Sequence, residues 1–241
     1  MQSAAFRATG LDWSYEIADV PAEQLEPTIG SLRKPEMGGA NVTIPHKVAA
    51  IDYLDAVEGE AQRIGAVNTI RREGERLLGS NTDVEGIRQA ALAMGIRDCR
   101  DMEVVVLGAG GSARAAAEAL AGAALTFVAR RPGATSLPGR VLDWSAGAWE
   151  PLVRRSDLLV NATPLGREGE LPLPVDDLPE DGAVIDLVYV SGGTPLVRAA
   201  RLRGLACADG WAVLLAQGAA SFSAWTGRPA PLEAMRRALA V

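Results

Sequence analysis

The chain has 241 residues, of which 48% are hydrophobic and 22% are charged, a composition typical of a globular protein with one large or two smaller domains. Its net charge of −6 argues against nucleic acid as a partner, because affinity for phosphate backbones comes from clustered cations. No apolar run approaches membrane-spanning length and no signal peptide precedes the first predicted helix, so we expect no membrane partner and a cytoplasmic location. Two distant cysteines and one histidine form no metal-ligand cluster, and we predict no metal.

The first eighty residues show alternating helix and strand patterns. The predicted elements are a helix over 2–9, an aromatic strand over 11–20, a helix over 21–33, a strand over 41–44 ended by Pro45, and a helix from His46 and Lys47 toward Leu54. Alternation in the second strand would aim Asn41 and Thr43 to one side of it. Two apolar runs, 66–70 and 77–79, flank a charged turn and predict a hairpin. It leads to a helix over 84–94, for which Asp83 suits the N-cap position.

A short apolar strand over 102–107 runs directly into a glycine-rich turn and then an alanine-rich helix. Glycines allow such a turn and let the backbone approach a ligand closely. The first N–H groups of the helix and the positive end of its dipole suit a pyrophosphate. The spacing G-x-G-x-x-A therefore predicts dinucleotide binding by Gly108, Ala109, Gly110, Gly111, Ser112 and Ala113.

A second apolar strand, 124–129, closes this βαβ unit and is followed by Arg130 and Arg131. An NAD-preferring site usually carries a carboxylate there, which accepts hydrogen bonds from the ribose 2′-OH. Guanidinium groups instead match a 2′-phosphate, so NADP is favoured. Two arginines that simply form a solvent-exposed corner are the alternative interpretation.

The remainder of the chain continues to alternate strands and helices. Strands are predicted over 140–144, 157–160, 183–189 and 205–208, with helices over 194–204, 211–225 and 231–240. This pattern predicts a doubly wound, Rossmann-like α/β sheet with ligands at the carboxyl ends of its strands, where Asn161, Thr163 and Tyr189 fall. Gln217 is the one strongly polar residue inside the long apolar helix, so it is either a hydrogen-bonded core residue or part of a site.

Lysine is unusually scarce in this sequence. Only Lys34 and Lys47 are lysines among 24 cationic residues. Arginine stays protonated, whereas a lysine can exchange a proton in the right surroundings. Lys47 is therefore a candidate for acid–base chemistry, although two lysines could also have been retained by chance.

Seven motifs, in order, resemble the shikimate dehydrogenase family, whose members reduce 3-dehydroshikimate to shikimate with NADP. They are NVTIPHK at 41–47, GAVNT at 65–69, NTDVEG at 81–86, GAGGSA at 108–113, NATPLG at 161–166, DLVY with TPL over 186–196, and DGWAVLLAQ at 209–217.

This resemblance implies a substrate domain formed by residues 1–82 plus 213–241 and a dinucleotide-binding domain over 83–212, in a monomer or homodimer. It also implies that Lys47 transfers the proton and that Asp83 is its paired carboxylate. The remaining roles implied are substrate binding by Thr43, Asn68, Asp83, Gln217 and Tyr189, and cofactor binding by the glycine-rich turn with Arg130, Arg131, Asn161, Thr163, Val188, Gly210 and Val213.

The sequence departs from the family pattern in three places. After the second dinucleotide strand, the family's Asn-Arg-Thr is Ala129-Arg130-Arg131 here, so Arg130 is kept and NADP stays favoured. The family's first strand and its carboxylate-binding Ser-x-Ser segment are not found before Gln2, so we expect either an upstream translation start or a shortened form with weaker affinity for the substrate carboxylate. Near the nicotinamide, Ala212 and Val213 replace the usual Gly-Met pair. Two other functions stay open: a quinate/shikimate dehydrogenase-like paralogue that uses another hydroxy acid or NAD, and a catalytically weak NADP-binding module.

Overall fold

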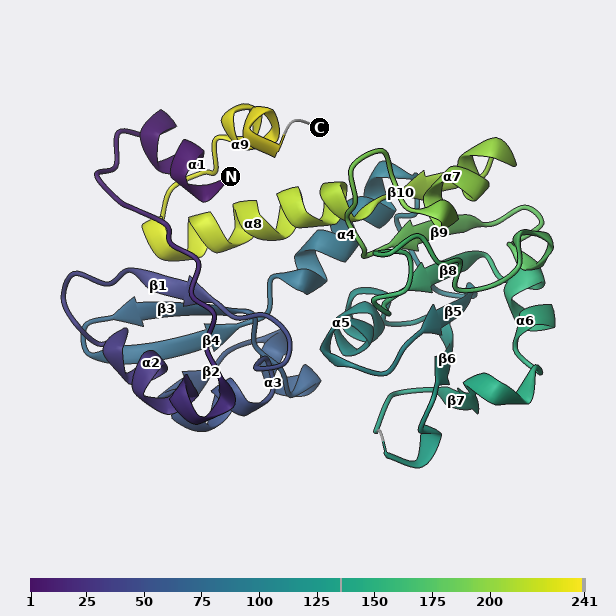
Figure 1. The fold of residues 1–241 in the computed structure, drawn as a ribbon, viewed down its shortest axis with the longest axis horizontal. Helices are drawn as coiled ribbons and strands as arrows, with labels where there is room; N and C mark the ends of the chain where they lie inside the picture. The colour runs from purple at the N-terminus through teal and green to yellow at the C-terminus, as the bar shows by residue number, and fades with distance from the viewer. Residues whose placement is uncertain (135, 240–241) are drawn as a thin grey trace. The chain divides into compact units, whose positions relative to one another are not determined.

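The computed structural model describes residues 1–134 and 136–239 and divides into two compact units. One unit is Met1–Glu85 with Leu215–Val241, and the other is Gly86–Leu214. The chain passes between them inside two helices, α4 (Asp83–Ala93) and α8 (Gly210–Thr226) (Figure 1). We call these the first and the second unit.

The first unit contains short helices and a small mixed sheet. Its elements are α1 (Gln2–Ala8), the 3₁₀ helix η1 (Ala22–Gln24), α2 (Leu25–Ser31), β1 (Gly39–Asn41), the 3₁₀ helix η2 (Ala49–Tyr53), β2 (Ala56–Val57), α3 (Glu60–Ile64), β3 (Thr69–Glu73), β4 (Arg76–Ser80) and α9 (Leu232–Leu239). The sheet order is β1-β3-β4-β2, with the predicted hairpin β3–β4 at its centre. The end of the terminal helix predicted to reach Ala240 lies outside the described residues.

Two apolar clusters hold the first unit together. One packs α2, η2 and α3 against the sheet through Leu25, Ile29 and Leu77, all of which are buried. The other joins α1, α8 and α9 through Phe6, Phe222 and Met235. The helices bury apolar stripes at helical spacing, which is the pattern that made them predictable from sequence.

The segment predicted as an aromatic strand over 11–20 forms no strand. It is extended but pairs with no other strand, and its aromatic side chains pack individually. Trp13 lies edge-on to Phe6 with ring centroids 5.5 Å apart, and Tyr15 lies 6.0 Å from the Trp225 ring. The alternating aromatic residues therefore pack as side chains here and do not belong to a hydrogen-bonded strand pair. Periodicity in the sequence does not distinguish these two cases.

Three further predictions in this unit are wrong in their limits. The helix predicted over 21–33 is divided into η1 and α2, and the strand predicted to reach Ile44 ends at Asn41. The chain then turns, with the His46 N–H donating to the Thr43 carbonyl at 2.9 Å, so no helix begins at His46. These limits depend on hydrogen bonds to neighbouring segments, which cannot be predicted from the local sequence.

The second unit is built on a fully parallel sheet. Its remaining elements are β5 (Glu103–Leu107), α5 (Gly111–Ala119), β6 (Ala124–Ala129), the 3₁₀ helix η3 (Pro132–Ala134), β7 (Arg140–Asp143), the 3₁₀ helix η4 (Trp144–Ala146), α6 (Glu150–Arg155), β8 (Leu158–Asn161), the 3₁₀ helix η5 (Val175–Asp177), β9 (Ala183–Asp186), α7 (Pro195–Leu202) and β10 (Ala206–Ala208). The strand order is β10-β9-β8-β5-β6-β7, so the chain winds outward from β5 in both directions. This arrangement confirms the predicted α/β fold with a doubly wound sheet.

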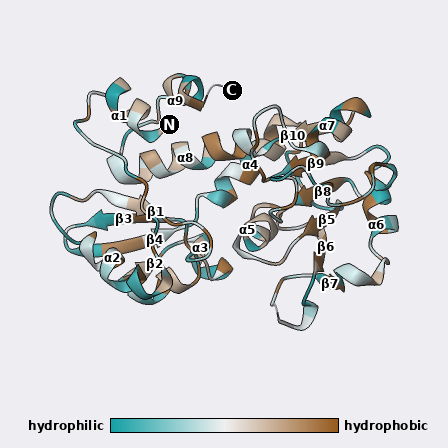
Figure 2. Ribbon diagram, viewed as in Figure 1, coloured by the Kyte–Doolittle hydropathy of each residue, from teal (hydrophilic) through white to brown (hydrophobic). Residues whose placement is uncertain are grey.

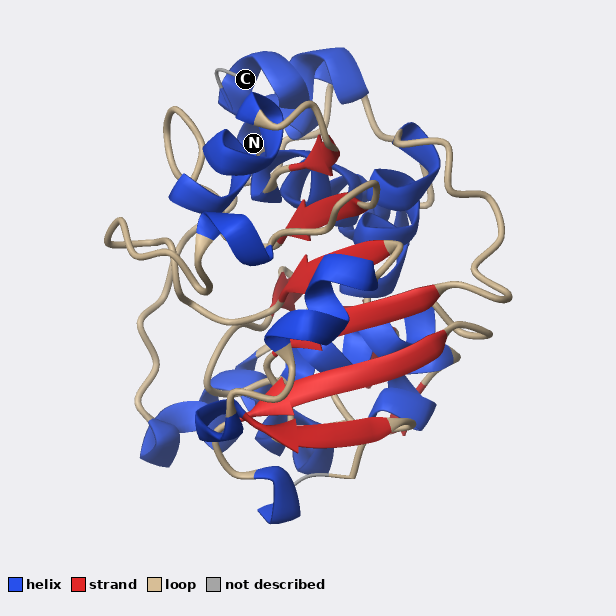
Figure 3. Cartoon of the chain, turned by 90° about the vertical axis from the view of Figure 1, so that its right-hand side faces the viewer, coloured by secondary structure: helices blue, strands red, loops and turns tan. Residues whose placement is uncertain are grey.

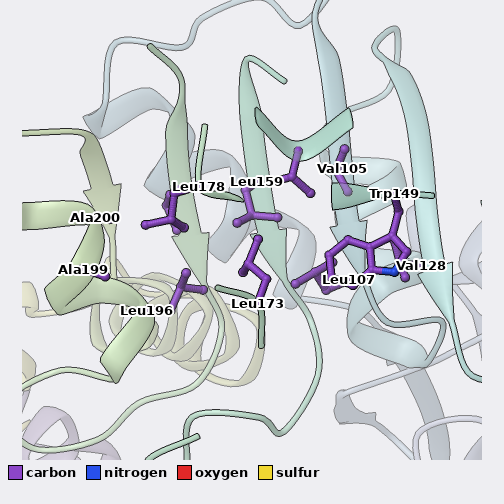
Figure 4. Close-up of a cluster of buried hydrophobic side chains, with 12 residues drawn as sticks. Val105, Leu107, Val128, Trp149, Leu159, Leu173, Leu178, Leu196, Ala199 and Ala200 are labelled. Carbon is purple, nitrogen blue, oxygen red and sulfur yellow. The ribbon is translucent and has the colours of Figure 1, made fainter. Parts of the chain in front are cut away.

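The central strands are apolar on both faces because helices cover both faces. Figure 2 shows these strands in hydrophobic colours, and Figure 3 shows them side by side with helices in front and behind. On one face α6 and α7 pack against β5, β8 and β9 around Leu107, Leu159 and Leu196, all fully buried (Figure 4). The α5 helix lies on the opposite face (Figure 1). Such burial explains why continuous apolar runs, rather than alternating ones, predicted these strands.

The order of the sheet reverses between β5 and β8, so the loops after these strands leave in opposite directions. Ligands of such folds bind at the carboxyl ends of strands near this reversal. Gly108 follows β5, and Asn161 ends β8. The strand predicted over 183–189 ends at Asp186, and residues 187–189 form an irregular segment beyond it. The predicted ligand-binding edge of the sheet therefore lies where the glycine-rich turn is.

Candidate active site

An ion pair between Lys47 and Asp83 lies at the centre of the polar residues in the first unit. The Lys47 Nζ lies 2.6 Å from Asp83 Oδ2, and the two side chains are only 13% and 16% exposed. Partial burial strengthens the attraction between them and limits the alternative conformations of both. The sequence prediction that these two groups lie together is thus met by their geometry, whereas their catalytic role stays a proposal.

Asn68 joins this pair from the loop before β3. Its Nδ2 donates to Asp83 Oδ1 at 2.8 Å and lies 3.4 Å from Gln217 Oε1. Both carboxylate oxygens of Asp83 therefore accept a hydrogen bond, one from an ammonium and one from an amide. The arrangement fixes the plane of the Asp83 carboxylate between these two donors.

Backbone hydrogen bonds bring these side chains together. The Val67 N–H donates to the Lys47 carbonyl at 2.8 Å, and the Asn68 N–H donates to the Ser80 carbonyl at 3.0 Å. The residue 83 N–H donates to Asn81 Oδ1 at 3.1 Å. Asp83 is therefore the first residue of α4, not its N-cap: Asn81 supplies the capping oxygen, and the Asp83 carboxylate receives Lys47 and Asn68 instead.

The other predicted substrate-binding residues are placed differently. Gln217, on α8, is half-buried beside Asn68. Thr43 is exposed in the turn after β1. Tyr189 is 46% exposed and belongs to the second unit. The first unit thus brings together Lys47, Asn68, Asp83 and Gln217.

Sequence reasoning missed three hydroxyl residues that surround Asn68 and Gln217. They are Thr69, Thr82 and Ser221, and Thr69 and Ser221 are fully buried. Thr69 and Thr82 directly adjoin predicted site residues. Ser221 lies four residues after Gln217, one turn later on the same face of α8, and that spacing was an available signal.

In the second unit the glycine-rich turn is closely packed at Gly108 and open at Gly110. Gly108 has φ +113, and a Cβ at this position would lie 3.0 Å from the Ala162 carbonyl oxygen. The α5 helix begins at Gly111 without a side-chain capping bond, and Gly110 is exposed beside it. A helix start without a side-chain cap, beside an exposed glycine, suits a bound phosphate group.

Arg130 and Arg131 follow directly after β6 and are both exposed. The end of β6 is the strand end next to the glycine-rich turn, because β5 and β6 pair in parallel from Glu103 with Ala124 to Leu107 with Val128. Two guanidinium groups at this place would hold a 2′-phosphate, and no carboxylate replaces them at the first two positions after the strand.

The loop after β8 is fixed by a buried carboxylate. Asn161 Nδ2 donates to Asp186 Oδ1 at 2.9 Å, and Asn161 Oδ1 accepts from Thr163 Oγ1 at 2.7 Å. Thr194 Oγ1 also donates to Asp186. Burial is the largest influence on Asp186 and raises the pKa of its carboxyl, against the opposing effect of these hydrogen bonds. Asn161 and Thr163 are thereby held rigidly beside Gly108.

The irregular segment after β9 is packed tightly against the start of α8. A Cβ on Gly210 would lie 2.5 Å from the Val188 carbonyl carbon, so only glycine fits there. Trp211 Nε1 donates to the Val190 carbonyl at 3.1 Å, and its ring lies 5.2 Å from that of Tyr189. Val188 and Val213 are both buried. These contacts hold the backbone of residues 188–190 in one position.

Across residues 1–134 and 136–239, no three His, Cys, Asp or Glu side chains come together in a way that could hold a metal ion. Within the same residues, no helix combines the length and the apolar character that crossing a membrane requires.

Comparisons with known proteins agree with this geometry. Residues 1–70 match the model of the shikimate dehydrogenase substrate binding domain, and residues 210–240 match that of the shikimate 5'-dehydrogenase C-terminal domain. A shikimate dehydrogenase (NADP(+)) from Geobacter metallireducens is 40% identical over 258 residues, covering 98% of this chain and 89% of the relative.

Solved structures show the same likeness. Shikimate dehydrogenase from Aquifex aeolicus superposes with a TM-score of 0.90 at 30% identity, covering 99% of this chain and 90% of that one. The Thermus thermophilus enzyme in complex with NADP(H) and shikimate gives a TM-score of 0.84 at 38% identity, covering 98% and 91%.

The second unit's fold and glycine-rich turn define an α/β protein of the dinucleotide-binding class, and its first unit carries a lysine–carboxylate pair. Identity of this level over nearly the whole chain settles the family. The chain belongs to the shikimate dehydrogenase family.

Proposed function

We propose that this protein catalyses the NADP-dependent, reversible reduction of 3-dehydroshikimate to shikimate. The observation that carries the proposal is the Lys47–Asp83 pair with Asn68 on its second carboxylate oxygen. Family membership supplies the substrate class, since the relatives that match over nearly the whole chain are named for this reaction.

The proposed chemistry assigns the proton to Lys47. Oxidation of a carbinol requires its hydroxyl proton to leave, and the Lys47 side chain in its neutral amine form accepts that proton directly or through one water, becoming the ammonium. In the reverse direction its ammonium protonates the developing alkoxide. Asp83 holds Lys47 in place through the 2.6 Å contact and also holds one substrate hydroxyl. Positioning of this kind lowers the entropy cost of the proton transfer.

Asn68, Gln217 and Thr43 bind the ring hydroxyls in this proposal, together with Tyr189 from the second unit. Amide groups suit such hydroxyls because each presents both a donor and an acceptor. A site built to hydrogen-bond hydroxyls rejects analogues that lack them, because its own buried polar groups would then be unpaired. We therefore expect discrimination among substrates that differ at a ring hydroxyl.

NADP, when bound, supplies or accepts the hydride. The residues that would hold it are the glycine-rich turn from Gly108 to Ala113, with Arg130 and Arg131 at its 2′-phosphate. Asn161, Thr163, Val188, Gly210 and Val213 would enclose its nicotinamide end. Two features of this chain support the proposed cofactor site. The N-terminus of α5 has no side-chain cap, and the turn is so closely packed that a Cβ on Gly108 would lie against the Ala162 carbonyl oxygen.

The deciding experiment measures initial rates with shikimate and quinate, each with NADP and NAD, on the parent chain and on Lys47→Ala. We expect the shikimate–NADP pair to give the highest kcat/KM, and Lys47→Ala to lose roughly 10²–10⁴-fold in kcat with unchanged NADP affinity. The matched control is Lys34→Ala, which removes the only other lysine, an exposed one, and should leave the rates unchanged.

Each other outcome selects a different function. Higher rates on quinate or with NAD would identify a paralogue of different specificity. NADP binding without turnover of either acid would identify a catalytically weak binding module. Equal activity in Lys47→Ala and the parent would exclude Lys47 from the chemistry.

A further inference from the structure

We propose that Thr69, Thr82 and Ser221 form a positioning cluster for the reaction, in which three buried hydroxyls fix the direction of the Asn68 carboxamide and thereby the Asp83 carboxylate. We call these three residues the hydroxyl cluster. The inference rests on the proposed function, because it assigns a role to side chains that act through Asn68 and Asp83 rather than on substrate.

The hydroxyl cluster is a closed triangle drawn from three separate parts of the first unit. Thr69 begins β3, Thr82 precedes α4, and Ser221 lies on α8. The Thr69 and Ser221 oxygens are 2.9 Å apart, and the Thr82 oxygen lies 3.1 Å from each. Their exposed fractions are 0%, 8% and 0% for Thr69, Thr82 and Ser221. In such surroundings each hydroxyl proton needs a protein acceptor.

The Thr82 backbone N–H settles which end of the Asn68 carboxamide is oxygen, and the hydroxyl cluster adds a second donor to that oxygen. The atom facing the cluster accepts the Thr82 backbone N–H at 2.7 Å and the Thr69 hydroxyl at 3.0 Å. A backbone N–H can only donate, so this atom must be Oδ1. The NH₂ end then faces Asp83 Oδ1 at 2.8 Å. A flipped amide would set its NH₂ against the N–H and its oxygen against the carboxylate.

The direction of the hydrogen bonds is set from the opposite side by Asn41. The Tyr15 hydroxyl donates to Asn41 Oδ1 at 3.0 Å, which turns the Asn41 NH₂ inward. That NH₂ faces three acceptors, Ser221 Oγ at 3.0 Å and both Thr69 Oγ1 and the Asn68 carbonyl at 3.1 Å. Because an NH₂ can only donate, the Thr69 and Ser221 hydroxyls present lone pairs to it and direct their protons to other acceptors.

The same cluster reaches the second predicted substrate-binding amide. Ser221 Oγ donates to the Gln217 backbone carbonyl at 3.0 Å, and Thr82 Oγ1 lies 3.3 Å from Gln217 Oε1. One set of hydroxyls therefore contacts both predicted site amides, Asn68 before β3 and Gln217 on α8. Hydrogen bonds in such a chain polarise one another, so losing one member weakens its neighbours.

Thr69→Val tests the proposal, because it keeps the branched shape and removes only the hydroxyl. Parent and variant are compared in shikimate oxidation with NADP, in NADP affinity and in melting temperature. We expect kcat to fall roughly five- to tenfold, with NADP affinity unchanged. Thr69→Ser, which returns the hydroxyl, should restore kcat to within about twofold of the parent. Packing alone would predict the opposite ranking, since serine removes a buried methyl group.

Thr226→Val is the matched control, because it makes the same substitution on α8, the helix that carries Ser221, and the Thr226 hydroxyl donates outside the cluster, to the Phe222 carbonyl at 2.8 Å. Its kcat should equal that of the parent. Should Thr69→Val not fold, Ser221→Ala replaces it with the same expected loss. Parent kinetics in both cluster variants, with an active parent, would overturn this inference alone. An inactive parent would overturn the proposed function and this inference together.

Discussion

The candidate sites of the two units are built from different parts of the chain. In the first unit the candidate site is built from side chains: an ammonium, a carboxylate and two amides, tied by hydrogen bonds between 2.6 and 3.4 Å. In the second unit it is built mainly from backbone: a glycine-rich turn, an uncapped helix end and a glycine pressed against a neighbouring segment.

This difference indicates which amino-acid substitutions each candidate site would tolerate. A site of charged side chains fails when an atom is removed, because its partner is left unpaired in a partly buried place. A site of bare backbone fails when an atom is added, because a Cβ occupies space that a ligand or a neighbouring strand needs. Substitutions of the two kinds should therefore affect turnover and cofactor affinity separately.

The largest effect is expected from Asp83→Asn, which keeps the size of the side chain but removes its charge. Lys47 and Asn68 would both lose their carboxylate partner, so kcat should fall by roughly 10²-fold or more, with NADP affinity unchanged. Steady-state rates and NADP titration measure the two quantities. Asp52→Asn, an exposed carboxylate on η2, is the control. A large loss of NADP affinity in Asp83→Asn would break the proposed separation between the units.

Gly108→Ala and Gly110→Ala sharpen the comparison within the second unit. At Gly108 a Cβ meets the Ala162 oxygen at 3.0 Å and φ is +113, so we expect a loss of about 1–3 kcal/mol in the free energy of unfolding together with weaker NADP binding.

At Gly110 a Cβ has no protein atom within 4 Å among the described residues, so Gly110→Ala should bind NADP weakly while its melting temperature stays near that of the parent. Normal NADP affinity in Gly110→Ala would contradict a pyrophosphate at this turn. Gly30→Ala, also without neighbours within 4 Å but in the first unit, is the control for both.

Arg130→Ala should weaken NADP binding by about tenfold, since one charge-assisted phosphate contact is lost, and leave NAD binding unchanged. Arg131→Ala is the matched comparison and should have the smaller effect, because Arg130 is the position that matches the family pattern. Binding of both cofactors measured by fluorescence titration gives the result. Equal weakening of NADP and NAD in Arg130→Ala would show that this arginine does not read the 2′-phosphate.

The smallest expected effect concerns pH and Asp186. Burial raises the pKa of this carboxyl, and the nearby Asp209 acts in the same direction. A carboxyl whose pKa is raised by folding contributes stability that is complete below its unfolded pKa, near 3.9, and is lost as pH rises through the folded value. Asp186→Asn cannot titrate.

The free energy of unfolding of the parent, minus that of Asp186→Asn, should therefore decrease as pH rises from about 4 toward neutrality. Denaturant titrations across this range measure the difference. An increase with pH would mean that the hydrogen bonds from Asn161 and Thr194 outweigh burial.

Some parts of this fold were predictable from sequence for a clear physical reason. Strand β5 is buried from Val104 onward and β6 from Phe127 onward, and both are apolar runs bounded by glycine or charge, so composition alone outlines them. The 11–20 segment has an equally regular pattern, yet strand formation depends on a partner that a local window does not contain. The same limit explains the early end of β1 at Asn41.

The candidate site divides in a similar way. Gly108 and its neighbours follow from local geometry, because strand, turn and helix are adjacent in the chain. Lys47 and Asp83 are separated by 36 residues, and their pairing was predictable only from the family motifs. Ser221 is 152 residues from Thr69, so no local pattern could join the hydroxyl cluster.

The scarcity of lysine gives the Lys47–Asp83 ion pair a practical use. Isotopic labelling of lysine side chains would introduce only two ammonium signals, one from exposed Lys34 in solvent and one from Lys47 beside its carboxylate. Magnetic resonance could then follow a single nitrogen while ligands are added, with the second signal as an internal reference in the same tube.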